Sequence, residues 1–313
     1  MDNLTHSLIG AVLGQAGLKR KTGLAMPALI IAANLPDIDA PCTFFGTQSL
    51  AMRRGLTHGP IALVVLPLLL AGGLILYDRW QARRGKRPEA RAPVNPGWLV
   101  ALCYIGTLTH PAFDWLNSYG IRLLEPFSSQ WFYGDALFII DPWLLAILGG
   151  GIWLSRRREN ERFARPARPA RVAIGLVSGY VALNLMISSL SLHFYDGPSV
   201  AVSNPVPVAF WRREILWRDD GSVMRKVPFP ERYGRWQFSL FDASNFEHED
   251  FGPTNMSDPR IADRLPTNPD ARAFLFWSRM PIAENSGDNI VLKDQRFLQI
   301  PARGPFTVIL PPN

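Results

Sequence analysis

Long uncharged runs, separated by short basic stretches, fill the first two thirds of this 313-residue chain. Each run is close to the roughly 20 residues that a helix needs to cross a hydrocarbon core of about 30 Å. Hydrophobic residues make up 48% of the chain and charged residues 19%, which argues against disorder and against an ordinary soluble protein. We therefore predict four membrane spans, over residues 59–77, 92–113, 136–155 and 172–195.

The N-terminal region differs from these spans because its two apolar runs are shorter. Residues 4–18 and 22–36 would each form a helix of about 22 Å, with Lys19, Arg20 and Lys21 between them. They predict a short helical hairpin that need not cross the membrane. A cleavable signal peptide is not expected, because Asp2 stands where a positive n-region should be and the small-residue cleavage pattern is missing.

The basic residues indicate an orientation. Residues 1–194 contain 19 Lys and Arg, and 16 of them fall in the stretches 19–21, 79–91 and 156–171. The loop 114–135 contains one, Arg122. The positive-inside tendency then predicts that the three stretches are cytoplasmic and that this loop and everything after residue 195 lie outside. Such clustering does not suit nucleic-acid binding, which needs positive charge along one folded face.

The last part of the chain has the pattern of a small β domain. Residues 195–313 carry 14 basic and 15 acidic residues. Apolar and polar residues alternate around Trp236, Phe238 and Leu240, and residues 219–222 (DDGS) have a hairpin-turn composition. We expect two domains, a helical membrane domain over 1–194 and an extracytoplasmic, mainly β domain over 195–313 with one compact antiparallel sheet. The further strands predicted are 210–217, 223–227, 273–280, 289–292 and 306–310.

Three histidines of the membrane region each follow a threonine, and the predicted topology brings them to one level. His6 begins the hairpin, His58 begins one span and His110 ends the next, so all three face the outer boundary. His193 and His248 do not share this setting. We interpret His193 as an interfacial residue and His248 as part of a solvated acidic loop.

Five aspartates reach the same level. Asp37 and Asp39 end the hairpin, Asp114 follows His110 by one helical turn, and Asp135 and Asp141 begin the next span from that side. Imidazole and carboxylate together suit Zn, Mn or Fe, and the set is large enough for one or two ions. A metal site at the outer boundary is therefore predicted, with Zn the expected ion.

Polar residues beside these aspartates and histidines leave alternatives open. Arg54 lies on the outer side, where the positive-inside tendency disfavours arginine. It either clamps a phosphate or carboxylate of a substrate, or it pairs with lipid headgroups or with one of the aspartates. Residues 117–120 (NSYG) either orient the ligands, or residues 118–120 simply end the helix.

The motifs that carry these residues occur in an order that resembles a known family. They are Thr5-His6-Ser-Leu-Ile-Gly10, Leu35-Pro-Asp37-Ile-Asp39, Arg54-Gly55-Leu-Thr57-His58, and His110-Pro-Ala-Phe-Asp114 with Asn117-Ser-Tyr-Gly120 and Glu125-Pro-Phe-Ser128. Residues 1–155 thereby resemble bacterial inner-membrane proteins regarded as metal-dependent hydrolases, some of them controlled by the SOS repressor. Gly59 departs from the serine usual there. The resemblance implies a multi-pass inner-membrane protein with a metal site made of His6, Asp37, Asp39, His58, His110 and Asp114.

We therefore expect an integral-membrane metal-dependent hydrolase that acts on an amphiphilic ester, phosphoester or amide, such as a lipid or a lipid-linked molecule. Asp135 or Asp141 would relay a proton and Arg54 would steady the anion. The alternatives are an ion or solute transporter, since ionisable groups in membranes often mark ion paths, and a non-catalytic scaffold that displays the β domain. The charge-free spans argue against a transport path, and a scaffold would leave the His/Asp set without a role.

Overall fold

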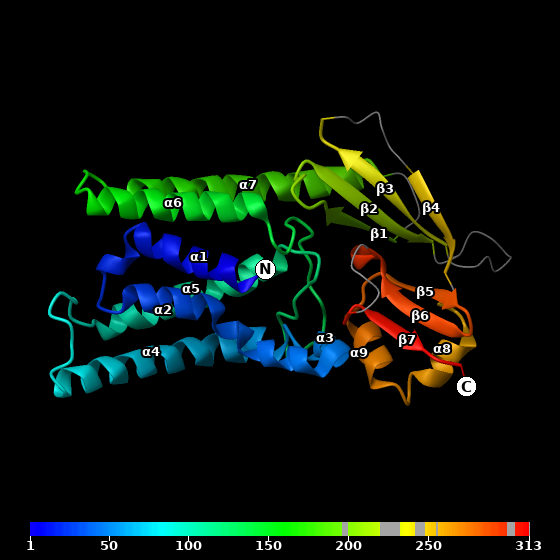
Figure 1. Cartoon of the computed structure of the whole chain (residues 1–313), viewed down its shortest axis with the longest axis horizontal. Helices are drawn as coiled ribbons and strands as arrows, with labels where there is room; N and C mark the ends of the chain where they lie inside the picture. Colours follow the sequence, from blue (N-terminus) through cyan, green and yellow to red (C-terminus); the bar gives the residue numbers. More distant parts are fainter. Residues whose placement is uncertain (196–199, 220–231, 242–247, 255, 299–303, 313) are drawn as a thin grey trace. The chain divides into compact units, whose positions relative to one another are not determined.

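The computed structural model describes residues 1–195, 200–219, 232–241, 248–254, 256–298 and 304–312. The chain divides into two compact units (Figure 1). The first unit comprises Met1–Asp39 and Arg54–Leu183, and the second comprises Ala40–Arg53 and Asn184–Asn313. This division falls inside the last long helix, eleven residues before the domain boundary predicted at 194/195. The units are described separately below.

Helices build the first unit, and two of them, α5 and α6, begin at a proline that follows a polar cap. Asn95 and Asp141 each accept a hydrogen bond from a backbone N–H in the first turn of their helix, and Pro96 and Pro142 occupy its first position. The cap at Asp141 starts its helix six residues later than the predicted start at 136. The long helices are α1 (Asn3–Gln15), α2 (Ala25–Asn34), α4 (Pro60–Arg83), α5 (Pro96–Trp115), α6 (Pro142–Asn160) and α7 (Arg168–His193).

Three helical segments in the described residues are long and apolar enough to cross a membrane. They are Ala25–Met52, Pro60–Arg83 and Arg168–His193. Two of these correspond to predicted spans, and the first extends the second arm of the predicted hairpin. The runs at 92–113 and 136–155 form α5 and α6, but they are not among the three candidates, so crossing by α5 and α6 stays a prediction.

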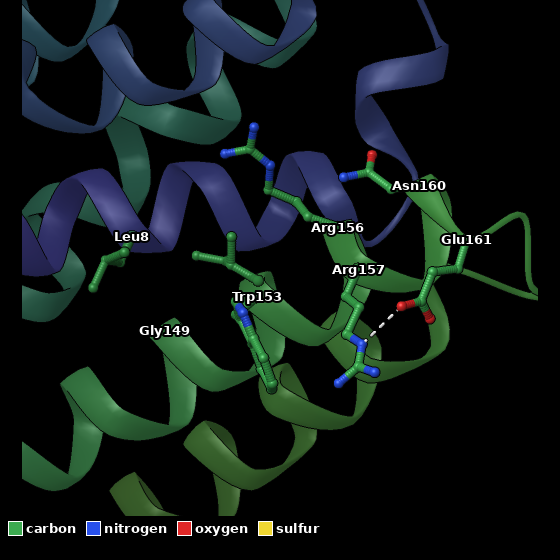
Figure 2. A pocket seen from close by; sticks show the side chains of 8 residues that line it. Leu8, Gly149, Trp153, Arg156, Arg157, Asn160 and Glu161 are labelled. Atoms are coloured by element: carbon green, nitrogen blue, oxygen red, sulfur yellow. Dashed lines mark hydrogen bonds and ion pairs between the residues drawn. The ribbon is translucent and has the colours of Figure 1, made fainter.

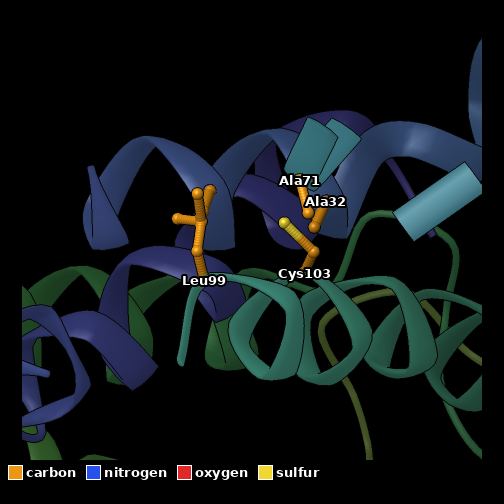
Figure 3. Close-up of a cluster of buried hydrophobic side chains, with 5 residues drawn as sticks. Ala32, Ala71, Leu99 and Cys103 are labelled. Carbon is orange, nitrogen blue, oxygen red and sulfur yellow. The ribbon is translucent and has the colours of Figure 1, made fainter. Parts of the chain in front are cut away.

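Small residues allow the helices of the first unit to approach closely. A Cβ atom added at Gly10 of α1 or Gly106 of α5 would lie 2.6 or 2.9 Å from the carbonyl oxygen of Leu29 in α2. A cluster of buried side chains lies between α2, α4 and α5, and Figure 3 shows Ala32, Ala71 and Cys103 meeting there. Van der Waals packing of small side chains is how membrane helices gain stability without a hydrophobic driving force between them.

The three basic stretches lie at one end of this unit, and the first residues of α1 and α4 and the last residues of α5 lie at the other (Figure 1). His6, His58 and His110 belong to or adjoin these helix ends. Lys19 forms an ion pair with Glu159, and Arg171 Nε donates to the Ala16 carbonyl over 2.9 Å. Gly23 N donates to the Pro93 carbonyl over 3.0 Å, which brings the 79–91 stretch to the same end. The bundle thus supports the prediction that these stretches share one side, whereas the side itself stays a prediction.

The second unit contains two antiparallel sheets where one was predicted. Gln295 joins them, because its Nε2 donates to the Gly234 carbonyl over 2.7 Å. One sheet has the order β1-β2-β3-β4, from Val200–Pro205, Arg212–Asp219, Arg232–Ser239 and His248–Pro253, and the other has the order β5-β6-β7, from Pro281–Ser286, Asn289–Asp294 and Thr307–Leu310.

Most predicted strands are confirmed, and one is wrong. Residues 273–280, predicted as a strand, belong largely to helix α9 (Pro269–Trp277). Asn268 caps this helix by accepting from Ala271 N, and Pro269 starts it. The predicted strand 223–227 lies outside the described residues. The short helix α8 (Pro259–Arg264) precedes α9.

Candidate metal centre

Four buried side chains in the first unit can hold a metal ion. They are Asp37, His58, His110 and Asp114, and each offers a ligand atom within 4.8 Å of the other three. His110 and Asp114 are one turn apart on α5. Asp37 lies in the 3₁₀ helix Leu35–Gln48 that follows α2, and His58 ends the 3₁₀ helix Leu56–His58 that precedes α4. The site therefore joins three helical elements.

The two histidines face each other through the same ring atom. His58 Nε2 lies 3.1 Å from His110 Nε2. Asp114 Oδ2 lies 3.6 Å from His58 Nε2 and 3.5 Å from His110 Nε2. Asp37 Oδ1 lies 3.8 and 3.7 Å from the same two nitrogens. The four atoms surround a common point.

A backbone carbonyl sets the tautomer of His110. Its Nδ1 lies 2.7 Å from the oxygen of Ala33, at the end of α2. Because a carbonyl oxygen can only accept, Nδ1 carries the proton and Nε2 presents its lone pair to the cluster. The close packing of α2 on α5 thus orients a candidate ligand.

A side-chain relay sets the tautomer of His58. Thr57 Oγ1 lies 2.9 Å from Asp39 Oδ2 and 2.9 Å from His58 Nδ1. The carboxylate accepts the hydroxyl proton, so the hydroxyl oxygen accepts from Nδ1–H. His58 Nε2 therefore also presents a lone pair to the cluster. Hydrogen bonding of the second ring nitrogen is typical of metal-ligating histidine.

This donor set fits a divalent cation. Two imidazole lone pairs that face each other at 3.1 Å repel unless a cation lies between them. Two nitrogens held about 2.0–2.1 Å from one tetrahedral Zn are about 3.3 Å apart, close to the separation here. Asp114 Oδ2 is buried and accepts no hydrogen bond from the described residues. Two imidazoles and two carboxylates also suit Mn or Fe, so the set does not determine which metal binds.

Three more groups border Asp114. The His6 ring stacks on His110 with 3.8 Å between centroids, and His6 Nε2 lies 3.3 Å from Asp114 Oδ1, which the Met1 amino group also contacts. Arg54 Nε lies 3.2 Å from Asp114 Oδ2. The positive charge of Arg54 thus lies beside a candidate ligand. This agrees with one of the two alternatives for Arg54, that it pairs with one of the aspartates.

The Arg54 side chain is held from several directions. Its Nη1 donates to Asn117 Oδ1 over 3.1 Å, and its guanidinium lies 4.5 Å from the centre of the Tyr119 ring. The backbone N–H of Arg54 donates to Asp39 Oδ2 over 2.9 Å. Arg54 has a φ of 54°, in the left-handed region that a non-glycine residue adopts at a cost. Asn117 thus orients Arg54, whereas one prediction was that it orients a metal ligand.

The remaining residues predicted for the site are Asp39, Asp135 and Asp141. Asp39 is 3.6 Å from His58 Nδ1. Asp141 caps α6, and its Oδ2 accepts from the Tyr180 hydroxyl over 2.9 Å. Asp135 is buried, with a φ of 48°, in a segment whose neighbours Gly134 and Ala136 donate to the backbone carbonyls of residues 115 and 116. The proposed roles of Asp135 and Asp141 stay predictions.

Two orienting groups were not predicted. In the sequence Thr57 is one of three threonines that precede a histidine, and nothing sets it apart from the other two. The Ala33 group is a backbone carbonyl, which the identity of the side chain does not reveal. Thr5 and Thr109 also precede histidines, but Thr5 Oγ1 donates to Asp2 and Thr109 Oγ1 to the Gly106 carbonyl. Thr57 differs from both because its hydroxyl also contacts Nδ1 of the histidine that follows it, and because its carboxylate partner, Asp39, comes from another element.

The helical unit and its buried site define a class of protein: a helical membrane protein with a candidate metal centre at one end of its bundle. The profile of the YdjM inner membrane protein family matches residues 1–191, and the chain belongs to this family. The match contains all four candidate ligands and ends near the end of α7. No curated protein and no solved structure matches the chain.

Proposed function

We propose that this protein is an integral-membrane hydrolase that depends on a divalent metal. The observation that carries the proposal is the pair of buried histidines with facing Nε2 atoms, which two carboxylates complete to a ligand set. His58, His110, Asp37 and Asp114 would hold the ion. A divalent metal there would polarise a scissile carbonyl or phosphoryl group and acidify a water molecule.

The surrounding residues have separate tasks in this proposal. Thr57 and Asp39 hold His58 in the tautomer that can bind metal. Arg54 balances the charge of Asp114 and steadies the anion that develops during hydrolysis. Asp135 or Asp141 relays a proton. Asp141 accepts from Leu144 N and from the Tyr180 hydroxyl.

The proposed location is the outer boundary of the bacterial inner membrane. It rests on the arrangement of the first unit, in which the basic stretches lie opposite the ligand cluster, and on the positive-inside tendency. In this arrangement α4, α5, α6 and α7 cross the membrane and the β-rich part is extracytoplasmic. The substrate is then an amphiphile whose headgroup reaches that level, such as a lipid or lipid-linked ester, phosphoester or amide.

The test is hydrolysis by detergent-purified protein of a panel of lipid esters, lipid phosphoesters and N-acyl amides, with added Zn or Mn. We expect metal-dependent turnover that Asp114→Asn lowers at least 100-fold and His193→Ala leaves unchanged. His193 is an exposed residue of the second unit and a matched control. Turnover that is equal in Asp114→Asn and wild type would refute the assignment of the site.

One observation favours a second candidate, a non-catalytic scaffold with a structural metal. His58, His110 and Asp114 are fully buried, and structural metal sites are closed whereas catalytic ones keep a position open. A scaffold would bind metal, unfold when a chelator removes it, and hydrolyse no member of the panel. The hydrolase would exchange a position of its metal with inhibitors such as hydroxamates or phosphonates, which an absorption spectrum of the Co-substituted protein reports.

A further inference from the structure

A pocket of about 510 Å³ lies between α1 and α6 and extends along α6 to the basic residues at the end of that helix (Figure 2). Leu8 of α1 and Gly149 of α6 line its apolar part. Trp153 lies one helical turn beyond Gly149 on α6, and Arg156 and Arg157 follow it. The pocket thus changes along α6 from apolar to cationic.

The charges at the basic part are only partly compensated. Arg157 Nε pairs with Glu161 Oε1 at 3.0 Å. Arg156 is exposed and forms no ion pair with the described residues. Asn160 adds an amide that can donate. Figure 2 shows the guanidinium groups of Arg156 and Arg157 pointing away from each other. Arg156 alone therefore offers a guanidinium without an ion pair, and one such fork can bind two phosphate oxygens.

The apolar part has the form that an acyl chain needs. A Cβ atom added at Gly149 would have no neighbour within 4 Å, so the missing side chain keeps this part of the pocket open. The side chain of Trp153 is 60% exposed. Exposed tryptophan is common where a membrane protein meets the membrane–water interface. A soluble phosphate compound would gain nothing from this apolar wall, whereas a phospholipid uses both parts.

We infer that this pocket binds an anionic phospholipid, with the phosphodiester at Arg156, the charge of Arg157 nearby on the same helix, and an acyl chain along Gly149 and Leu8. Basic pockets between membrane helices at the cytoplasmic side are known to take lipid headgroups of this charge. The inference needs the chain to be embedded in a membrane, but not the metal site or any hydrolase activity.

The experiment is thermal unfolding of the full chain in neutral detergent, with phosphatidylglycerol added to one sample, phosphatidylcholine to another and inorganic phosphate to a third. We expect phosphatidylglycerol to raise Tm by several degrees more than phosphatidylcholine, and phosphate to have no effect. Arg156→Gln with Arg157→Gln should abolish the difference between the two lipids. Arg158→Gln removes one charge from the same helix outside the pocket lining and should retain the difference.

A second variant tests the apolar part without altering charge. Gly149→Leu places a side chain in the open space and should remove the effect of phosphatidylglycerol while the protein alone stays folded, since leucine favours a helix over glycine. The inference is wrong if the double arginine variant and wild type respond equally to phosphatidylglycerol. It is also wrong if inorganic phosphate stabilises the wild type as strongly as the lipid, because the site is then a simple anion site.

Discussion

His58 Nε2 and His110 Nε2 lie 3.1 Å apart, buried at one end of the helical bundle of the first unit, and in both rings the other nitrogen already donates a hydrogen bond. Neither ring can therefore donate a proton to the other while both are neutral. Protonation of one ring would satisfy the pair but would place a further charge in a buried site beside Arg54. A metal ion satisfies both lone pairs and the carboxylates of Asp37 and Asp114 together.

The Thr57 hydroxyl is expected to govern metal affinity. Thr57→Val keeps the shape of the side chain but removes the link between Asp39 and His58, so the imidazole loses its preferred tautomer. We predict a 10–100-fold loss of metal affinity, measured by competition with a chromogenic chelator. Thr109→Val is the matched control, because Thr109 precedes His110 but donates to the Gly106 carbonyl. Equal affinity in the two variants would contradict the relay.

Gly59 is predicted to be required for packing beside the site. A Cβ atom at this position would lie 1.9 Å from the carbonyl oxygen of Glu125. Gly59→Ala should therefore destabilise the protein by about 1–3 kcal/mol, which thermal unfolding in detergent measures. Gly149→Ala, which meets nothing within 4 Å, should be neutral or slightly stabilising. A Gly59→Ala protein as stable as wild type would show that this loop approaches less closely than described.

Much of the site was predictable from the sequence because helix ends on the same side of a membrane lie at the same height. Asp37, His58 and His110 come from distant positions, yet their placement at helix ends was enough to bring them together. Thr57 could not be separated from Thr5 and Thr109, since the carboxylate that selects it arrives from another element. In the second unit the alternation of residues 273–280 suggested a strand, but the Asn268-Pro269 start fixed a helix that buries Phe274 and Trp277.

A buried ion pair in the second unit should make its stability depend on pH. Burial raises the pKa of Asp294, but the charge of Arg296 and hydrogen bonds from Arg296 and Ser278 outweigh burial and hold the pKa below its ordinary value. A depressed pKa in the folded state contributes stability above the unfolded-state pKa of about 3.9, and this contribution is lost as pH falls through the lower folded-state pKa.

Asp294→Asn should accordingly cost about 3–5 kcal/mol at pH 7, because Arg296 remains buried without its partner, and it should flatten the acid side of the stability curve. Thermal unfolding measured from about pH 7 down to below the unfolded-state pKa of about 3.9 tests this. Asp263→Asn, at an exposed position of α8, should follow the wild-type curve. A parallel shift of the Asp294→Asn curve at all pH values would contradict the assignment.

The orientation can be tested in cells. A reporter that is active only outside the cytoplasm, fused after Asn313, should be active, and a reporter that is active only inside, inserted within residues 83–91, should be active too. The reason is the concentration of 16 basic residues in the three stretches predicted to be inside. Silence of both reporters would place the ligand cluster at the cytosolic boundary.

The metal content of detergent-purified protein tests the central claim most directly. Wild type and His193→Ala, purified without chelator, should contain at least one equivalent of a transition metal by elemental analysis. His58→Ala and His110→Ala should insert and purify normally but lose most of that metal, because each removes one of the two nitrogens of the four-residue ligand set. If wild type contains no transition metal, or if both site variants retain the wild-type content, the two histidines are structural residues and the proposed metal centre does not exist.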